Sequence, residues 1–203
     1  MFMKNKISRT LAITAAVSTL ALTGNVLAET VNGTASVTVQ NGFTLTQTTP
    51  LSFGTIVALA DADGANSSDF ATLKVDSDGV TADVVDLSGA TNASIVPISA
   101  GTPGQFTVSG AAPNTVLTIT NPSAFTLSDP SAGDSKIFDV TAFTNDVVTS
   151  GSAFTYDTDA TGTLVFNIGA TLGTDNSLAG GTAAPVAYDN VTFTGTYTMT
   201  VDY

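Results

Sequence analysis

The sequence predicts an all-β fold built from two packed antiparallel sheets. Short runs of Val, Ile, Phe and Leu are separated by Gly, Ser, Thr, Asn and Asp, a composition typical of strands joined by turns. The helix formers Glu, Lys, Arg and Gln are nearly absent after residue 29. The chain has no cysteine, so its core and its hydrogen bonds, rather than a disulfide framework, must hold the fold.

Residues 1–28 form the first predicted element, a cleaved signal peptide. Three basic residues precede an uncharged stretch at 10–24, and small or branched residues end at Ala28, as signal peptidase requires. The apolar run is shorter than the roughly 20 residues of a membrane span. We therefore expect a secreted bacterial protein in the periplasm, at the cell surface or outside a Gram-negative cell, with no membrane insertion of the mature chain.

The expected mature chain, residues 29–203, is strongly acidic. It keeps only Lys74 and Lys136 against seventeen acidic residues, a net charge of −15. Nucleic acid and anionic membranes attract proteins through basic surfaces, so both are excluded as expected partners. About 175 residues suit a single domain with a sizeable core.

Residues 29–46 predict a long amphipathic N-terminal strand. The odd positions are mostly apolar or small, and the even positions are mostly Thr, Ser and Asn. The odd positions include Val31, Gly33, Ala35, Val37 and Val39. The segment is either an ordinary strand of a closed sandwich or a donor strand that adds to a neighbouring molecule.

Nine further strands are expected between the two ends of the mature chain, at residues 51–57, 71–75, 81–85, 94–99, 105–109, 115–120, 125–127, 137–143 and 164–168. So many short strands favour two stacked sheets and hence an immunoglobulin-like sandwich. Phe53, Phe106 and Phe166 each have apolar neighbours at period two, so we expect all three to be buried.

The last predicted strand covers residues 191–203. Its odd positions are apolar or Gly, and its even positions are Thr until Asp202, so one face is apolar and the other polar. Together with the N-terminal strand, its residues Tyr197, Met199, Val201 and Tyr203 are the candidates for contact with a partner strand.

The sequence offers few of the residue types that catalysis requires. Without His or Cys, Ser-His-Asp and Cys-His triads are excluded and zinc loses its usual ligands, so we expect neither an enzyme nor a resident cofactor. Asp61, Asp63 and Asp69 lie in the densest oxygen-rich stretch, a weak candidate calcium loop. It departs from the EF-hand spacing, and the alternative is a solvated acidic turn.

Three segments resemble a bacterial secreted β-domain family, domain of unknown function 4402. They are LTQTTPLSFGTI at 45–56, FTVSGAAPNTVLTIT at 106–120, and TGTLVFNIGATL at 161–172 with FTGTYTMTVDY at 193–203. The resemblance spans nearly the whole mature chain. It departs from the family in the acidic loop 58–69 and in 177–190, which are longer than expected.

The closing strand is also similar to those of spore-coat-U-type and chaperone–usher fimbrial subunits. This similarity implies a sandwich that lacks one strand, with a groove filled by the N-terminal extension of the next subunit. The expected function is therefore a structural subunit of a fimbria-like extracellular assembly, with itself or a fimbrial-type chaperone as partner. The alternative is a monomeric surface or matrix domain that binds carbohydrate or calcium through Asp-rich loops.

Overall fold

A computed structural model describes residues 30, 32–39, 42–61, 69–79, 83–87, 92–146, 153–175 and 185–203. The chain divides into two units, Met1–Val39 and Gln40–Tyr203. In the first unit, residues 32–39 form no strand and their side chains are exposed. Because a strand requires a neighbour to satisfy its backbone groups, the pattern predicted for 29–46 becomes a strand only from Thr44 onward.

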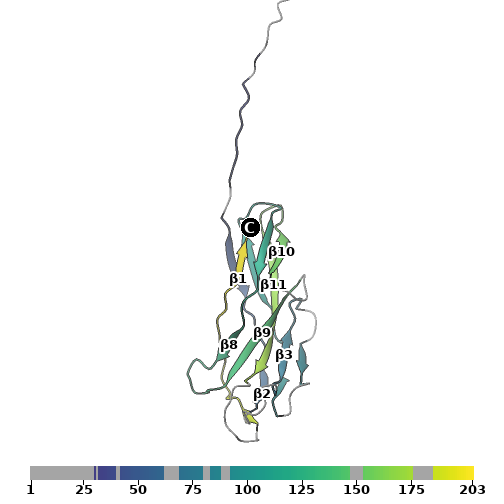
Figure 1. Cartoon of the computed structure of the whole chain (residues 1–203), viewed down its shortest axis with the longest axis vertical. Coiled ribbons are helices and arrows are strands. Elements are labelled where there is room, and N and C mark those ends of the chain that lie inside the picture. The colour runs from purple at the N-terminus through teal and green to yellow at the C-terminus, as the bar shows by residue number, and fades with distance from the viewer. Residues whose placement is uncertain are drawn as a thin grey trace, which may run out of the picture. The chain divides into compact units, whose positions relative to one another are not determined.

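The second unit is an antiparallel β-sandwich, which confirms the predicted all-β class. Among the described residues, its largest sheet has seven strands: β1 (Thr44–Thr49), β3 (Thr72–Val75), β4 (Val84–Asp86), β6 (Gly104–Ser109), β8 (Phe125–Ser128), β9 (Ile137–Asn145) and β11 (Leu164–Thr174). The path β1-β6-β11-β3-β4 is joined by β9, which pairs with both β11 and β8. Figure 1 shows β9 and β11 in the middle of the sandwich, between β8 and β3.

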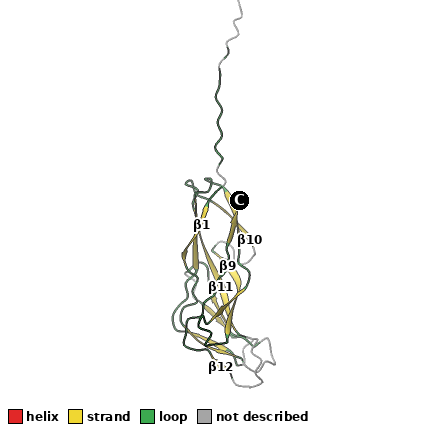
Figure 2. Cartoon of the chain, turned by 90° about the vertical axis from the view of Figure 1, so that its left-hand side faces the viewer, coloured by secondary structure: helices red, strands yellow, loops and turns green. Residues whose placement is uncertain are grey.

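The described part of the chain also forms two three-stranded sheets. One has the order β10 (Ala153–Asp157), β7 (Val116–Thr120), β13 (Thr200–Asp202), and the other the order β12 (Val186–Ala187), β2 (Ile56–Ala60), β5 (Ser94–Pro97). In Figure 2, β1 and β12 lie towards opposite ends of the sandwich. Within the described ranges there is no helix long and apolar enough to cross a membrane.

The core follows the period-two pattern of the strands. On β6 and β11 the even positions Phe106, Val108, Phe166 and Ile168 are buried, and the two Phe rings stack with centroids 5.5 Å apart. Phe53 is also buried. The prediction that Phe53, Phe106 and Phe166 all belong to the core is therefore confirmed.

Several strands differ from the predicted boundaries, two of them for identifiable reasons. β11 continues to Thr174 instead of ending at Ile168, because Gly169 fits where a Cβ would lie 2.2 Å from the Val75 carbonyl oxygen. The predicted strand 191–203 keeps its parity, with Phe193, Tyr197, Met199 and Val201 packed against the core, but it joins a ladder only at β13. β10 was missed by the sequence analysis, because Gly, Ser and Asp surround its short alternation.

Candidate functional site: an apolar groove in the sandwich

A groove of about 800 Å³ opens between two segments, residues 50–58 and 187–197. We call these segments the first lip and the second lip. The floor of the groove is apolar and comes from three strands of the large sheet: Phe125 and Leu127 on β8, Phe138 on β9 and Leu172 on β11. The groove therefore exposes part of the core between two stretches of backbone.

The two lips run antiparallel, and residues at or just beyond both ends of the first lip bond to the second lip or to β12 beside it. At one end β12 pairs with β2, and the Tyr188 N–H donates to the Ala58 carbonyl at 3.3 Å. At the other end the Gln47 side-chain amide donates to the Tyr197 hydroxyl at 3.1 Å. Between these two ties the lips form the sides of the groove without pairing to each other.

On each lip, the backbone edge that faces away from the groove forms hydrogen bonds with a neighbouring segment. On the first lip, Ser52 exchanges two backbone hydrogen bonds with Thr102, at 2.9 and 2.7 Å. On the second lip, Thr194 exchanges two with Ser128, both at 2.9 Å. Successive residues of an extended chain direct their backbone groups to opposite edges.

The inner edge of the second lip consequently carries unused backbone groups. Because Thr194 bonds outward to β8, an extended backbone is expected to direct the N–H and C=O groups of Phe193, Gly195 and Tyr197 to the opposite side, and all three residues line the groove. None of these three residues makes a backbone hydrogen bond with another described residue. Such an edge is a template for a further strand.

The groove is almost uncharged. Asp189 is the one charged residue among its described lining residues. The Tyr197 ring lies 5.2 Å from Phe125, and burial raises the pKa of its hydroxyl, against the opposing effect of the hydrogen bond from Gln47. The phenol therefore stays neutral around pH 7, and the groove favours an apolar, uncharged occupant.

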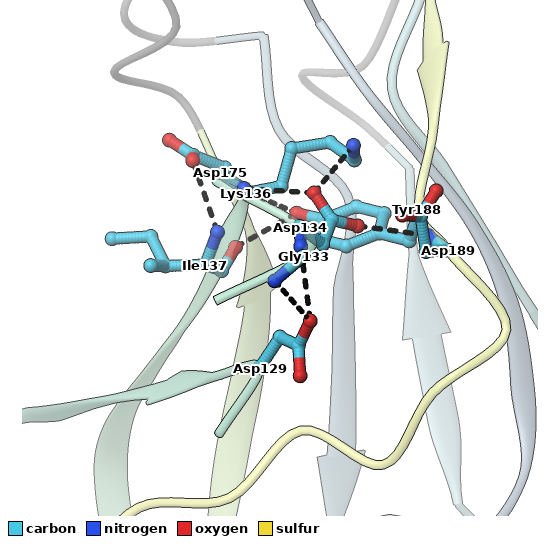
Figure 3. Close-up of polar contacts among 8 residues, drawn as sticks. All are labelled: Asp129, Gly133, Asp134, Lys136, Ile137, Asp175, Tyr188 and Asp189. Carbon is cyan, nitrogen blue, oxygen red and sulfur yellow. Dashed lines mark hydrogen bonds and ion pairs between the residues drawn. The ribbon is translucent and has the colours of Figure 1, made fainter. Parts of the chain in front are cut away.

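Lys136 and Asp134 hold the N-terminal end of the second lip in place at Asp189 (Figure 3). One Asp134 oxygen accepts from the Asp189 N–H at 2.8 Å, and the other accepts from the Lys136 N–H at 2.9 Å and forms an ion pair with its Nζ at 2.6 Å. Burial opposes ionisation, but the hydrogen bonds from Lys136 and Asp189 outweigh it and lower the pKa of Asp134. A charged Asp134 thus holds the lip at Asp189.

Tyr188 provides the second anchor at the same place. Its hydroxyl donates to the Ile137 carbonyl at 2.8 Å and accepts from the Asp175 N–H at 2.7 Å. Its ring stacks on Phe138 with centroids 4.1 Å apart. Figure 3 shows Ile137 and Asp175, the two hydrogen-bond partners of the Tyr188 hydroxyl, at the start of β9 and just after the end of β11. The end of the groove at Tyr188 is consequently fixed to the large sheet.

Asp129 organises the turn that carries Asp134. Its carboxylate accepts hydrogen bonds from the N–H groups of Ser131, Gly133 and Asp134 at 2.8, 2.8 and 2.9 Å, and from the Ser131 hydroxyl at 2.6 Å. The hydrogen bonds from Ser131 are the main reason that the pKa of Asp129 is lowered to about 2.

Acid is expected to weaken the sandwich through this turn. The folded-state pKa of Asp129 lies below its ordinary value of 3.8, so its contribution to stability is complete above that value and is lost as pH falls towards about 2. Asp134 acts in the same direction, whereas Asp139, whose pKa is raised by burial and by Asp175, opposes it. We expect the destabilisation caused by Asp129→Asn to be largest above pH 4 and to shrink towards pH 2. Urea midpoints measured from pH 2 to 6 check this, and a difference independent of pH would contradict it.

Of the three residues of the candidate calcium loop, the structure brings two, Asp61 and Asp69, to the same neighbour. Asp61 and Asp69 are buried, so the solvated-turn alternative is wrong for these two. Both carboxylates bind Asn92: Asp69 accepts from its N–H at 3.1 Å, and Asp61 from its side-chain amide at 3.4 Å. Asp63 lies outside the described residues. In the described part of the chain no three acidic side chains are grouped as a metal site would require, and calcium binding stays a prediction.

The candidate partner-binding residues fall into two groups. In the N-terminal unit Gly33, Ala35, Val37 and Val39 are exposed, Val37 by 86% and Val39 by 70%, and Val31 lies outside the described residues. At the other end, Tyr197 lines the groove, Met199 and Val201 pack on the core, and Tyr203 contacts Phe43 edge-on at 5.4 Å.

Sequence reasoning missed the floor and the anchor of the groove. Phe125, Leu127 and Phe138 were placed in strands, but nothing in their spacing indicates an open floor. The one available signal for the anchor was that Lys136 is one of only two lysines after residue 28, and a lysine buried in an acidic protein requires a buried partner.

Comparison with known proteins gives a family match. Residues 43–203 match the family model described as "Domain of unknown function (DUF4402)". No curated protein and no solved structure matches the chain. The match begins after the first unit and covers the entire sandwich with its groove.

Proposed function

Since the chain belongs to the DUF4402 family, whose description names no activity, we propose a function from the groove: the protein is a structural subunit of a fimbria-like extracellular or cell-surface assembly, built by β-strand addition. The observation that carries this proposal is an apolar groove bordered by the unused backbone edge of Phe193, Gly195 and Tyr197. An added strand pairs its backbone with that edge and places alternate side chains on the floor.

The composition supports an extracellular structural role. A signal-like segment at 1–28 would export the chain, and the absence of cysteine and histidine leaves a fold independent of disulfide formation and without the usual nucleophile and base pairs. The acidic surface keeps free subunits soluble through mutual repulsion. Assembly therefore depends on a specific contact, and the groove supplies one.

The proposal predicts that a charge on the groove floor prevents assembly. Leu127 lines the floor and is half-buried, whereas Thr126 on the same strand is exposed. In the chain from residue 29 onward, Leu127→Asp should remain monomeric because an added strand would bury an unpaired carboxylate. Wild type and the matched control Thr126→Asp should form oligomers. Light scattering coupled to size-exclusion chromatography measures the mass, and circular dichroism melting verifies that each variant is folded.

Two results would count against the proposal. If Leu127→Asp assembles as readily as wild type, oligomers form without the groove. If wild type remains monomeric at high concentration, the protein does not assemble by itself through strand addition, and the monomeric surface domain becomes the better interpretation.

A further inference from the structure

We propose that the occupant of the groove is residues 32–39 of a second copy of this chain, which lie antiparallel to the second lip with Val37 and Val39 facing the floor. This inference rests on the proposed function, and it specifies which strand is added and in which direction.

The length and pattern of residues 32–39 fit the groove. Eight extended residues span roughly 26 Å, and each lip contains at least one residue more than this segment. The odd positions from Gly33 to Val39 are apolar or small, and the even positions from Thr34 to Thr38 are hydroxyl residues. One face therefore suits the apolar floor while the other remains in water.

Charge also favours this segment. Residues 30–39 carry no charged side chain, in a chain whose formal net charge is −12. The described lining of the groove contains only Asp189. Strands rich in Asp from the same molecule would add repulsion and buried carboxylates, whereas this segment adds neither.

The backbone of the lips determines the expected direction. Because the lips are antiparallel to each other, a strand between them is parallel to one and antiparallel to the other. The first lip is a poor template: Gly54 has a φ of +74°, and the Thr55 carbonyl already accepts from Ile98 and Ser99 at 2.7 and 3.1 Å.

The second lip is the better template for pairing. It offers unused groups on Phe193, Gly195 and Tyr197 at regular spacing. The main ladder should form there, in the antiparallel arrangement that is slightly more stable per residue.

Disulfide mapping between copies tests both the donor and its direction. The chain has no cysteine, so introduced thiols are the only ones present. One copy carries Thr194→Cys or Thr196→Cys on the exposed side of the second lip, and the other carries cysteine at Thr34, Ser36 or Thr38. Oxidised mixtures of the chain from residue 29 onward are then compared by the yield of cross-linked dimer.

An antiparallel strand keeps the sum of the paired residue numbers constant. Moving the lip cysteine from position 194 to 196 should therefore shift the best donor position two residues towards the N-terminus. A shift in the opposite direction would overturn the orientation. Val37→Cys is the parity control, and it should cross-link poorly to both lip positions because its side chain faces the floor.

A pair of charge variants tests the donor independently of cross-linking. Val37→Asp should abolish oligomers, whereas Thr38→Asp, one residue away on the solvent side, should leave most of them. Both lie in the exposed N-terminal unit, so folding of the sandwich should not change. If assemblies form but neither the cross-links nor the Val37→Asp effect appear, the donor is a different strand and strand addition itself survives. If no assembly forms in wild type, the proposed function fails with it.

Discussion

Replacing Phe166 with alanine is expected to lower the free energy of unfolding by about 3–5 kcal/mol, the usual cost of truncating a buried Phe. Phe166 is fully buried in β11. Its ring stacks on Phe106 at 5.5 Å and lies 6.5 Å from Tyr156. Alanine would leave a cavity between the large sheet and the β10-β7-β13 sheet, because these rings come from both.

The matched control for Phe166 is the residue before it on the same strand. Val165 is 52% exposed, so Val165→Thr, which retains a β-branched side chain, should change stability by no more than about 0.5 kcal/mol. Urea unfolding with linear extrapolation measures both variants. An unchanged midpoint for Phe166→Ala would mean that the inward face of β11 has been assigned wrongly.

Replacing Lys136 with methionine should have a comparable effect for an electrostatic reason. The Asp134 side chain in the Lys136–Asp134 pair is fully buried, and that of Lys136 is 11% exposed. Methionine retains the apolar stem but leaves a buried carboxylate without its cation, which typically costs about 3–5 kcal/mol. Because Asp134 also accepts a hydrogen bond from the Asp189 N–H, the second lip should become more mobile near Asp189 as well.

The other described lysine is the natural control. Lys74 pairs with Asp76 at 2.8 Å, but the two side chains are 38% and 25% exposed, so Lys74→Met should cost no more than about 1 kcal/mol. Adding Asp134→Asn to Lys136→Met should recover part of the loss, since no unpaired charge then remains buried. Chemical unfolding gives the stabilities, and hydrogen exchange at Tyr188 and Asp189 reports the lip. Equal costs for the two lysine variants would contradict the anchoring role.

The residue pattern was sufficient for the strands and much of the core. Alternation with period two places Phe106, Phe166 and Val201 on the inward face whatever the neighbouring strands are, and the structure places them there. The charge balance is also a property of the sequence alone. The alternation of residues 32–39 was visible in the same way, although these residues form no strand.

Strand ends depended on contacts between distant segments. Gly169 lets β11 continue past Ile168 because the Val75 carbonyl approaches it closely, and no local signal encodes that approach. Similarly, residues 191–199 have a strand pattern, yet only Thr194 forms a bridge there. The Cβ that Gly195 lacks would lie 2.3 Å from the Thr126 carbonyl oxygen, so this position too is set by a neighbour.

The sequence by itself determined the all-β class, the inward parity of the strands and the acidic, cysteine-free character of the protein, because each depends on residue type and local spacing. Only the tertiary structure decided that two lips separated by more than 120 residues border one groove. It also decided that Lys136, Asp134 and Tyr188 fix the end of the groove near Asp189. A groove is the space left between strands, and it is set by which strands pair and where their ladders stop. Those pairings are long-range, so the alternation within any one strand cannot specify them.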